Sequence, residues 1–207
     1  MKLYLVRHGE TVWNKEGRVQ GHSDIPLNEY GRYLAEETAK GLKDIPFELA
    51  YTSPLSRAKE TAEIILAGRD VPIYEESKIQ EMGFGAAEGL RCRGENREPG
   101  SDEFNKLFTD TENYKVPEGG ESILQLMDRI RGFLQKLYEN PKLQDKAILI
   151  TSHGATLTAM LNLIKGKKEI AEFWENGVPV NCAVTEVEVR NGKPEILCEG
   201  KVYYERK

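Results

Sequence analysis

The 207-residue sequence has few cysteines and no long hydrophobic segment. Its three cysteines are widely spaced and include no Cys-x-x-Cys pair, which argues against a disulfide framework and against a zinc knuckle. The apolar runs at residues 3–6 and 147–150 are far shorter than the roughly 20 residues of a membrane-spanning helix. The N-terminal run is also too short for a signal peptide. We therefore expect a cytoplasmic protein with no membrane partner.

An excess of positive charge is also missing. Lys and Arg total 29 against 34 Asp and Glu, which gives a formal net charge of −5. Because binding to a nucleic-acid backbone needs a basic face, we expect no nucleic-acid partner. The hydrophobic fraction of 39% allows a real core, which excludes a disordered or fibrous protein. The chain contains only three histidines, His8, His22 and His153.

Apolar segments alternate with amphipathic segments along the chain. Residues 3–6 and 147–150 have the continuous apolar character of buried strands, and residues 47–51 are expected to form another strand. Helices are expected after the N-cap residues Asn28, Ser53 (to about residue 68) and Ser122, and over about residues 155–164 and 170–176. Alternation over 185–189, followed by Asn191-Gly192, predicts an antiparallel hairpin at a sheet edge. The predicted fold is α/β, a three-layer α/β/α sandwich around a mostly parallel sheet with an antiparallel edge.

Residues from about 84 to 118 interrupt this alternation. They are rich in Gly, Glu, Arg and Asn, and only a short amphipathic helix over about 102–108 is predicted there. We expect one domain over residues 1–207, with this segment inserted as a small cap on the core. The sequence leaves a monomer and a homodimer equally open.

Basic and imidazole side chains follow three of the predicted strands. Arg7 and His8 come after residues 3–6, His153 follows the strand at 147–150, and Arg57 lies in the helix after 47–51. Ligands of open α/β sheets bind beyond the carboxyl ends of the strands, so we expect these side chains to lie at one edge of the sheet. The first backbone amides of the helix after His153 should also favour an anion at this edge. Two arginines can bind a phosphoryl group through paired hydrogen bonds, and a neutral imidazole could attack phosphorus. The pattern indicates a phosphate site without a metal motif.

Further motifs occur in a fixed order along nearly the whole chain. They are Leu5-Val6-Arg7-His8-Gly9-Glu10-Thr11 with Trp13-Asn14, Gln20-Gly21, Asp24-x-Pro26-Leu27, Ser53-Pro54-Leu55-x-Arg57-Ala58, Glu81-Met82-x-Phe84-Gly85-x-x-Glu88-Gly89, Gly119-Gly120-Glu121-Ser122 and Ser152-His153-Gly154. In this order they resemble the signature of the histidine phosphatase superfamily, in its phosphoglycerate mutase-like branch. The resemblance implies a metal-independent phosphomonoesterase of the histidine acid type, without a cofactor, acting on small phosphorylated metabolites.

The resemblance also implies a role for each matching position. His8 would be the nucleophile that forms a phosphohistidine. Glu81 would be the general acid for the leaving group and then the base for the incoming water. Arg7, Arg57 and His153 would be catalytic by holding the phosphoryl oxygens. The phosphate-binding and pocket residues would be Arg7, Thr11, Asn14, Gln20, Gly21, Arg57, His153 and Gly154.

Three other functions compete with this interpretation. A cofactor-dependent phosphoglycerate mutase would use the same site, but family mutases usually carry a longer insertion before the helix that here begins at Ser122. They also have an Asn-Glu-Arg-His type of sequence around the acid, where this chain has Gln80-Glu81-Met82-Gly83. A metallohydrolase using His8 and His153 would suffer repulsion between its ion and the arginines. A non-catalytic protein that binds a phosphorylated partner would not need to keep His8, both arginines, Glu81 and His153 together, so their presence counts against this alternative.

Four further residues lie in or near the segments that carry the motifs. His22 is expected at the pocket rim or on the surface. Arg91 and Arg93, in the cap, are equally consistent with contact to the substrate and with exposure to solvent. Trp174 is expected to be a packing residue.

Overall fold

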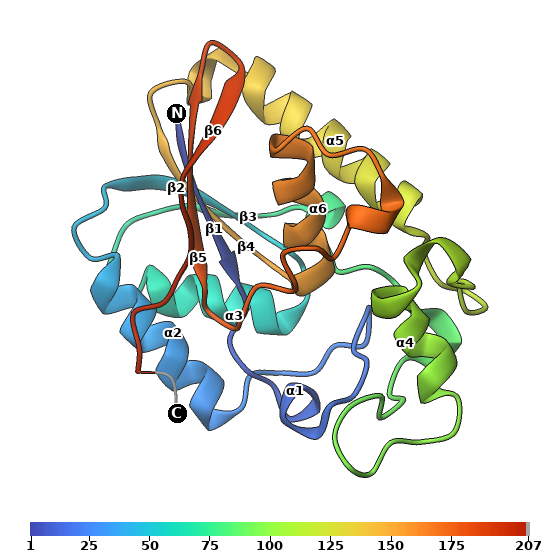
Figure 1. The fold of residues 1–207 in the computed structure, drawn as a ribbon. Coiled ribbons are helices and arrows are strands. Elements are labelled where there is room, and N and C mark those ends of the chain that lie inside the picture. Colours follow the sequence, from blue (N-terminus) through green and yellow to red (C-terminus); the bar gives the residue numbers. More distant parts are fainter. Residues whose placement is uncertain (206–207) are drawn as a thin grey trace.

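The structure, a computed structural model, describes residues 1–205 and contains a six-stranded sheet in the order β3-β2-β4-β1-β5-β6 (Figure 1). The strands are β1 (Lys2–Arg7), β2 (Phe47–Thr52), β3 (Ile73–Glu75), β4 (Ala147–Ser152), β5 (Val184–Arg190) and β6 (Lys193–Lys201). Strand β4 is parallel to β1 and β2, and β2 is parallel to β3. Strand β5 runs antiparallel to β1 and β6. The mostly parallel sheet with an antiparallel edge is confirmed.

Helices cover both faces of this sheet. Figure 1 shows α2 (Glu29–Gly41) and α3 (Ser56–Ile65) on one face, with α5 (Ile123–Glu139) and α6 (Gly154–Ile164) on the other. Two shorter helices, α1 (Val12–Glu16) and α4 (Ser101–Thr109), lie beyond the carboxyl end of β1. Short 3₁₀ turns occur at Ser77–Ile79, Gly85–Ala87, Thr111–Asn113, Pro141–Leu143 and Ile170–Glu172.

Strand β1 lies in the middle of the sheet and contributes to the core on both faces. Leu3 and Leu5 belong to the apolar cluster that includes residues of α5 and α6. Tyr4 and Val6 point the opposite way, into a second cluster that includes Ile65 of α3 and Leu42, the C-cap residue of α2. Because helices cover both faces of the sheet, polar and apolar residues do not alternate along the strand, and its sequence is continuously apolar over residues 3–6.

The predicted caps of two helices are confirmed. The Asn28 side chain accepts a hydrogen bond from the Gly31 N–H (2.7 Å) at the start of α2. At the start of α5, Ser122 and Gln125 form a reciprocal capping box. The hairpin prediction is also confirmed, because Asn191 (φ 51°) and Gly192 (φ 73°) form the turn between β5 and β6 with the two positive φ angles of a type I′ turn.

The helix predicted after Ser53 is present as α3, but its N-cap is wrong and it ends at Ile65 rather than about residue 68, and the helix predicted over 170–176 is wrong. Helix α3 has Leu55 rather than Ser53 at its N-cap, because the Ser53 hydroxyl is engaged with the Leu55 N–H (3.3 Å) and with His153 Nε2 (2.7 Å). Residues 170–176 form only a three-residue 3₁₀ turn, and the Phe173 carbonyl accepts a hydrogen bond from the Asn162 side chain. Helix α1 and strand β3, which are not predicted, are too short for periodicity to reveal them.

The segment predicted as a cap begins and ends at the same place. Phe84 forms an isolated bridge with Gly120, and a Cβ on Gly85, which has a φ of +50°, would lie 2.1 Å from the Glu118 carbonyl oxygen. Only glycine therefore allows the two ends to approach so closely. Within the segment, Phe104 of α4 packs edge-to-face against Phe84, with ring centroids 5.4 Å apart.

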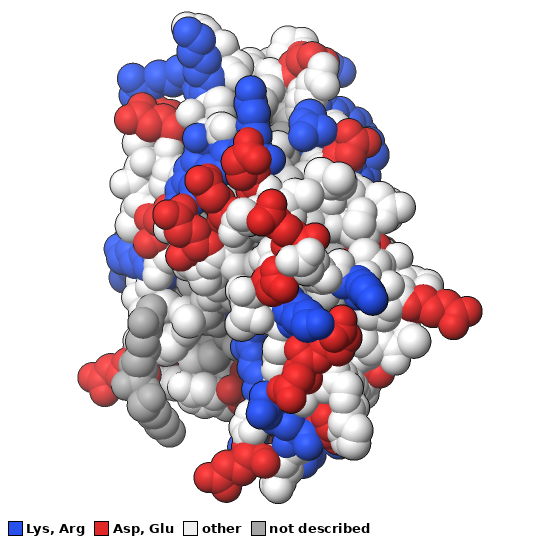
Figure 2. All heavy atoms as spheres, turned by 45° about the vertical axis from the view of Figure 1, so that its right-hand side comes forward, with Lys and Arg blue, Asp and Glu red and all other residues white. Residues whose placement is uncertain are grey.

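The outer surface carries both signs of charge. On the face seen in Figure 2, acidic and basic side chains are interspersed. Within residues 1–205, no helix combines the length and apolarity needed to cross a bilayer.

Candidate active site

The carboxyl ends of β1, β2 and β4 meet at one edge of the sheet. In the register, Arg7 lies opposite Ser152, and Thr52 lies opposite Thr151. The residues that follow these strands are therefore neighbours, and the rings of His8 and His153 have centroids 5.1 Å apart. The parallel register alone accounts for this juxtaposition of residues far apart in the sequence.

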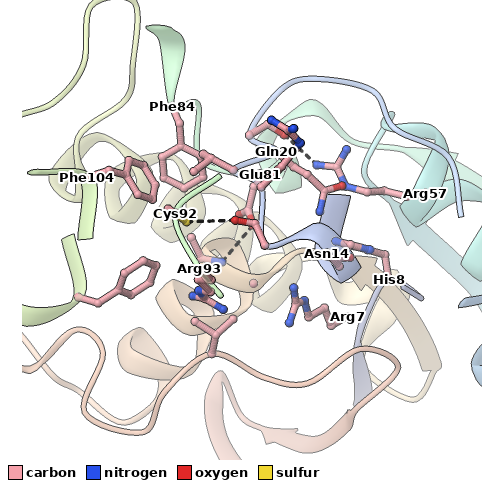
Figure 3. Close-up of a pocket in the computed structure, with 18 of the residues that line it drawn as sticks. Arg7, His8, Asn14, Gln20, Arg57, Glu81, Phe84, Cys92, Arg93 and Phe104 are labelled. Atoms are coloured by element: carbon pink, nitrogen blue, oxygen red, sulfur yellow. Dashed lines mark hydrogen bonds between the residues drawn. The ribbon is translucent and has the colours of Figure 1, made fainter. Parts of the chain in front are cut away.

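A cavity of about 110 Å³ opens at this edge (Figure 3). The candidate residues that line it are Arg7, His8, Asn14, Gln20, Gly21, Arg57, Glu81 and Gly154. Two other candidates, Thr11 and His153, are buried beside the lining and are not part of it.

His8 is a neutral imidazole with one nitrogen available. It is only 2% exposed, and its Nδ1 lies 2.7 Å from the Gly9 carbonyl oxygen. A carbonyl can only accept, so Nδ1 carries the proton and Nε2 holds a lone pair. Burial, followed by the charges of Arg57 and Arg7, places the pKa of His8 well below its ordinary value. Among the hydrogen bonds of residues 1–205, none engages Nε2.

Arg57 and Arg7 are fixed by backbone carbonyl groups. Arg57 is 1% exposed and donates to the carbonyl oxygens of Gly21 and Ser23, both at 2.8 Å. Arg7 donates to the Pro179 carbonyl oxygen at 2.6 Å. Burial lowers the pKa of Arg57 to about 10, so it remains charged at neutral pH. Because neither arginine forms an ion pair among the described residues, both charges remain available to an anionic ligand.

The Glu81 carboxyl group accepts hydrogen bonds from backbone amides at the start of α6. Its Oε1 accepts hydrogen bonds from the N–H groups of Met82 (3.0 Å) and Thr156 (3.1 Å), and its Oε2 accepts from Ala155 (3.2 Å). The helix start was expected to favour an anion, and in this structure its amide groups are bound by the Glu81 carboxyl group. Gly154 lies between Glu81 and Arg7, since a Cβ there would be 3.6 Å from Glu81 Oε2 and 3.8 Å from Arg7 Cζ.

Thr11 orients two amide side chains of the pocket. Its hydroxyl donates to Gln20 Oε1 (2.9 Å), and its backbone N–H donates to Asn14 Oδ1 (3.1 Å) within the capping box of α1. Both amide oxygens are thereby engaged, so the amide nitrogens are the groups that Asn14 and Gln20 can offer to a ligand. Thr11 acts behind the lining by fixing these two residues.

His153 is completely buried beside His8. Its Nε2 lies 2.7 Å from Ser53 Oγ, whereas its Nδ1 is buried without a hydrogen-bond partner among residues 1–205. Burial, followed by the charges of Arg57 and of its other neighbours, lowers the pKa of His153 well below its ordinary value. The ring is therefore neutral, with Nδ1 free to donate to a ligand when Nε2 accepts from the serine.

The opposite side of the cavity is mostly apolar, and of its residues the sequence had suggested only Arg93 as a contact of the substrate. Figure 3 shows Phe84 and Phe104 across the cavity from Arg7, His8 and Arg57. The residues on this side are Phe84, Cys92, Arg93, Phe104, Phe108 and Trp174. Trp174 packs as expected, with its ring centroid 4.7 Å from that of Phe108, and it also lines the cavity.

The two cap arginines differ in their surroundings. Arg93 lines the cavity, and its guanidinium lies over the Phe108 ring, 5.2 Å from the centroid. Arg91 is turned to Glu16, with which it forms an ion pair at 3.5 Å. A further residue missed by the sequence reasoning is Asn181, which donates to the His8 carbonyl oxygen at 2.9 Å. Asn181 precedes β5, whose antiparallel direction brings the incoming loop to the same sheet edge.

Residues 1–205 contain no group of three or more His, Cys, Asp or Glu side chains that could hold a metal ion. The site is thus built from two histidines, two arginines and one carboxyl group. Such a set can bind a phosphoryl group, attack it and exchange one proton.

Comparisons with known proteins agree with this chemistry. Residues 3–200 match the model of the histidine phosphatase superfamily, branch 1. The chain is 39% identical over 162 residues to the Bacillus subtilis protein described as uncharacterized phosphatase PhoE, covering 78% of this chain and 76% of that one. It is 34% identical over 172 residues to the probable phosphoglycerate mutase GpmB of Escherichia coli, covering 83% and 78%.

Two solved structures extend the likeness to the whole fold. Bacillus stearothermophilus YhfR superposes with a TM-score of 0.87 at 32% identity, over 97% of both chains. A phosphoserine phosphatase of Entamoeba histolytica, in complex with 3-phosphoglyceric acid, superposes with a TM-score of 0.79 at 27% identity, over 97% of both chains. The similar proteins thus include both phosphatases and a mutase.

Proposed function

Because the chain belongs to the histidine phosphatase superfamily, we propose that it is a metal-independent phosphomonoesterase that hydrolyses small phosphorylated metabolites through a phosphohistidine on His8. The observation that carries the proposal is the state of His8. Its Nδ1 proton is held by the Gly9 carbonyl, which leaves the Nε2 lone pair in a cavity that Arg7 and Arg57 also line. A phosphoryl group held by the two arginines would meet this lone pair directly.

In the first half-reaction, His8 Nε2 attacks phosphorus in line with the leaving oxygen. The nitrogen–phosphorus bond forms as the bond to the leaving oxygen breaks, and protonated Glu81 supplies the proton that the leaving alcohol needs. Arg7 and Arg57 stabilise the negative charge on the three equatorial oxygens. Asn14, His153 and the Gly154 amide add hydrogen bonds to the same oxygens.

In the second half-reaction, water attacks the phosphohistidine. Glu81 is now a carboxylate and accepts the proton of the water as the oxygen–phosphorus bond forms. The nitrogen–phosphorus bond breaks, inorganic phosphate is released, and His8 regains its neutral form. Protons and electron pairs balance over the two halves, so the cycle needs no further reactant.

The size of the cavity favours a small substrate. Its volume of about 110 Å³ is below the roughly 300–1,000 Å³ of pockets for drug-sized ligands. The aromatic side chains opposite His8 would contact the carbon skeleton of the substrate, while the arginines bind its phosphate. This division favours a phosphorylated metabolite over a phosphoprotein.

Turnover of p-nitrophenyl phosphate by the purified chain tests the proposal. We expect release of inorganic phosphate that a metal chelator does not inhibit. The reaction quenched with alkali should retain a phosphoenzyme that acid destroys. The variant His8→Ala should lose both, with a rate lower by at least about 10⁴-fold and an unchanged unfolding temperature. Substantial turnover by His8→Ala would rule out the nucleophile.

A second assay separates hydrolysis from phosphoglycerate mutation. The enzyme is given 3-phosphoglycerate with a trace of 2,3-bisphosphoglycerate, and inorganic phosphate and 2-phosphoglycerate are measured together. We expect phosphate release to exceed interconversion, because the chain lacks the longer insertion typical of the mutases. Rapid interconversion with negligible phosphate release would make the enzyme a mutase that uses the same His8 and Glu81.

A further inference from the structure

Glu88 has no role in the mechanism above, yet its side chain is among the most heavily hydrogen-bonded near the site. Its Oε1 accepts from the N–H groups of His22 (2.8 Å) and Phe84 (3.1 Å). Its Oε2 accepts from the N–H (2.7 Å) and the hydroxyl (2.6 Å) of Ser23. Among residues 1–205 no lysine or arginine forms an ion pair with it. The carboxylate therefore binds backbone and not a cation.

The segment that Glu88 binds is the segment that fixes Arg57. The N–H groups of His22 and Ser23 point to Glu88, while the carbonyl groups of Gly21 and Ser23 accept both hydrogen bonds of the Arg57 guanidinium. Residues 21–23 thus lie between a carboxylate and a guanidinium, and their peptide groups connect the two. A displacement of this segment would displace Arg57.

The geometry of Gly21 shows how closely the carboxylate approaches. Gly21 has a φ of +55°, and a Cβ at this position would lie 2.1 Å from Glu88 Oε1. Any other residue would push the carboxylate away from the segment. Burial raises the pKa of Glu88, but hydrogen bonds from Ser23, His22 and Phe84 outweigh burial and lower it overall. The group is therefore ionised at neutral pH and can accept all four hydrogen bonds.

The same carboxylate also reaches the segment that carries Glu81. Phe84, whose N–H binds Glu88, lies three residues after Glu81. On the other side, His22 Nε2 donates to the Glu81 carbonyl oxygen at 2.9 Å. Glu88 therefore connects the supports of the phosphate-binding arginine and of the general acid.

We propose that Glu88 is a positioning residue that holds Arg57 in place against the substrate phosphoryl group through residues 21–23. This inference rests on the proposed function. Its physical advantage is that a carboxylate placed directly on Arg57 would compete with the phosphate for the guanidinium. Acting through peptide groups, Glu88 fixes the position of Arg57 and leaves its charge for the ligand.

A double-mutant cycle tests the proposal. Glu88→Gln keeps the shape of the side chain, but its NH₂ group must face at least one backbone N–H donor in either orientation. We expect kcat/KM for p-nitrophenyl phosphate to fall about 10- to 100-fold, as expected for a misplacement of a catalytic group. In an Arg57→Ala background, the same substitution should cost less than about twofold, because no guanidinium remains to be positioned and p-nitrophenolate leaves without a proton from Glu81. Equal losses in both backgrounds would overturn the proposal.

Two further variants make the cycle decisive. Glu186→Gln changes a partly buried carboxylate of β5 that accepts from Lys2 and Tyr4, far from the pocket, and should leave kcat/KM unchanged in both backgrounds. Ser23→Ala removes one of the four hydrogen bonds to Glu88 and carries the cycle if Glu88→Gln does not fold. We expect a loss of a few-fold that disappears without Arg57, and a loss that persists would count against the proposal.

The cycle also separates this inference from the proposed function. Turnover that depends on His8, together with additive losses for Glu88 and Arg57, would contradict the positioning role alone. If wild-type turnover is absent, the proposed function fails, and the cycle is measured as the dissociation constant of inorganic phosphate. A weakening by Glu88→Gln that requires Arg57 would then still support the positioning role, and an additive weakening would refute it.

Discussion

On the sheet side of the pocket, Arg57 and Glu81 are held by hydrogen bonds to the backbone, whereas on the cap side Phe104 and Phe108 are held by contacts between rings. The polar groups have directional partners at fixed distances, and moving one of them would leave buried donors or acceptors unpaired. Ring contacts tolerate small rotations and shifts at modest cost.

The difference separates two tasks within one cavity. Stabilising a phosphoryl transition state requires charges that are fixed before the reaction begins. Accommodating the carbon skeleton of a substrate requires apolar area, and its exact shape matters less. We therefore expect substitutions on the sheet side to reduce the rate strongly, with the effect of Glu81 depending on the leaving group, and substitutions on the cap side to change the choice among substrates weakly.

The largest effect that sharpens this comparison is expected from Glu81→Gln with a poor leaving group. A glutamine cannot donate the proton that an alkyl alcohol requires, so hydrolysis of a sugar phosphate should slow by about 10²–10⁴-fold. Hydrolysis of p-nitrophenyl phosphate should slow far less, because its phenolate leaves without a proton. The ratio is measured as kcat/KM, which reports formation of the phosphohistidine, on both substrates, and equal losses on both would indicate that Glu81 is not the general acid.

The next effect is expected from Arg57→Lys on the same side. A lysine cannot bind the Gly21 and Ser23 carbonyl groups with the planar geometry of a guanidinium while also holding a phosphoryl oxygen. We expect kcat/KM to fall by about 10²–10³-fold for aryl and alkyl substrates alike. Arg131→Lys, on the exposed surface of α5, is the matched control and should leave kcat/KM unchanged. A loss confined to one substrate class would contradict a role in binding phosphate.

A third prediction concerns pH and again distinguishes the two sides. Burial keeps the pKa of His8 and of His153 far below that of an unfolded histidine, about 6.5. Below pH 6.5 the unfolded chain therefore binds protons that the folded chain excludes. The free energy of unfolding should fall by up to roughly 1.4 kcal/mol per pH unit for each histidine as the pH decreases below 6.5.

Urea unfolding at a series of pH values from 7.5 to 5.5 measures this slope. His8→Asn should reduce the slope by the contribution of one histidine, whereas Phe108→Ala on the cap side should leave it unchanged. A slope that does not change in His8→Asn would show that His8 is protonated in the folded enzyme.

The smallest effect is expected from Phe108→Ala on the cap side. The variant loses the ring contact with Trp174 and the support for Arg93, and such contacts contribute about 0.5–1.5 kcal/mol. We expect kcat/KM for 1-naphthyl phosphate to fall about 2- to 10-fold, and kcat/KM for glycerol phosphate to change less. Inhibition by inorganic phosphate, which has no carbon skeleton, should not change. A loss of phosphate inhibition would mean that the two sides are not independent.

The sheet side could be placed from the sequence because one topological rule suffices. Once residues 3–6 and 147–150 are taken as parallel strands, the positions of His8 and His153 at one edge follow without further information. Glu81 could be named only through the family resemblance. It lies after an irregular segment, and its partners, the first amides of α6, are more than 70 residues away in the sequence.

The cap side could not be placed, for a physical reason. Phe104 and Phe108 lie in the short helix α4, which was predicted, but the irregular segment around it does not indicate where that helix packs. Trp174 follows the 3₁₀ turn Ile170–Glu172, where a longer helix was predicted. Their contacts arise from tertiary packing of irregular chain, which no local pattern specifies. Asn181 was not predicted as a site residue for a related reason. The hairpin was predicted correctly, but the sequence did not indicate the path of the loop that leads into it.

The central position of β1 has a consequence for the order in which the molecule can form. This strand pairs with Ala147–Ser152 on one side and with Val184–Glu188 on the other, so its two neighbours are synthesised long after it. Contacts of such large sequence separation form slowly, because a long loop must close before any of them stabilises the chain. His8, although it is among the first residues made, acquires its buried environment only when the last third of the chain has emerged. A nascent chain that ends before β5 should therefore expose the apolar strand β1, and should depend on chaperones or on continued synthesis to avoid aggregation.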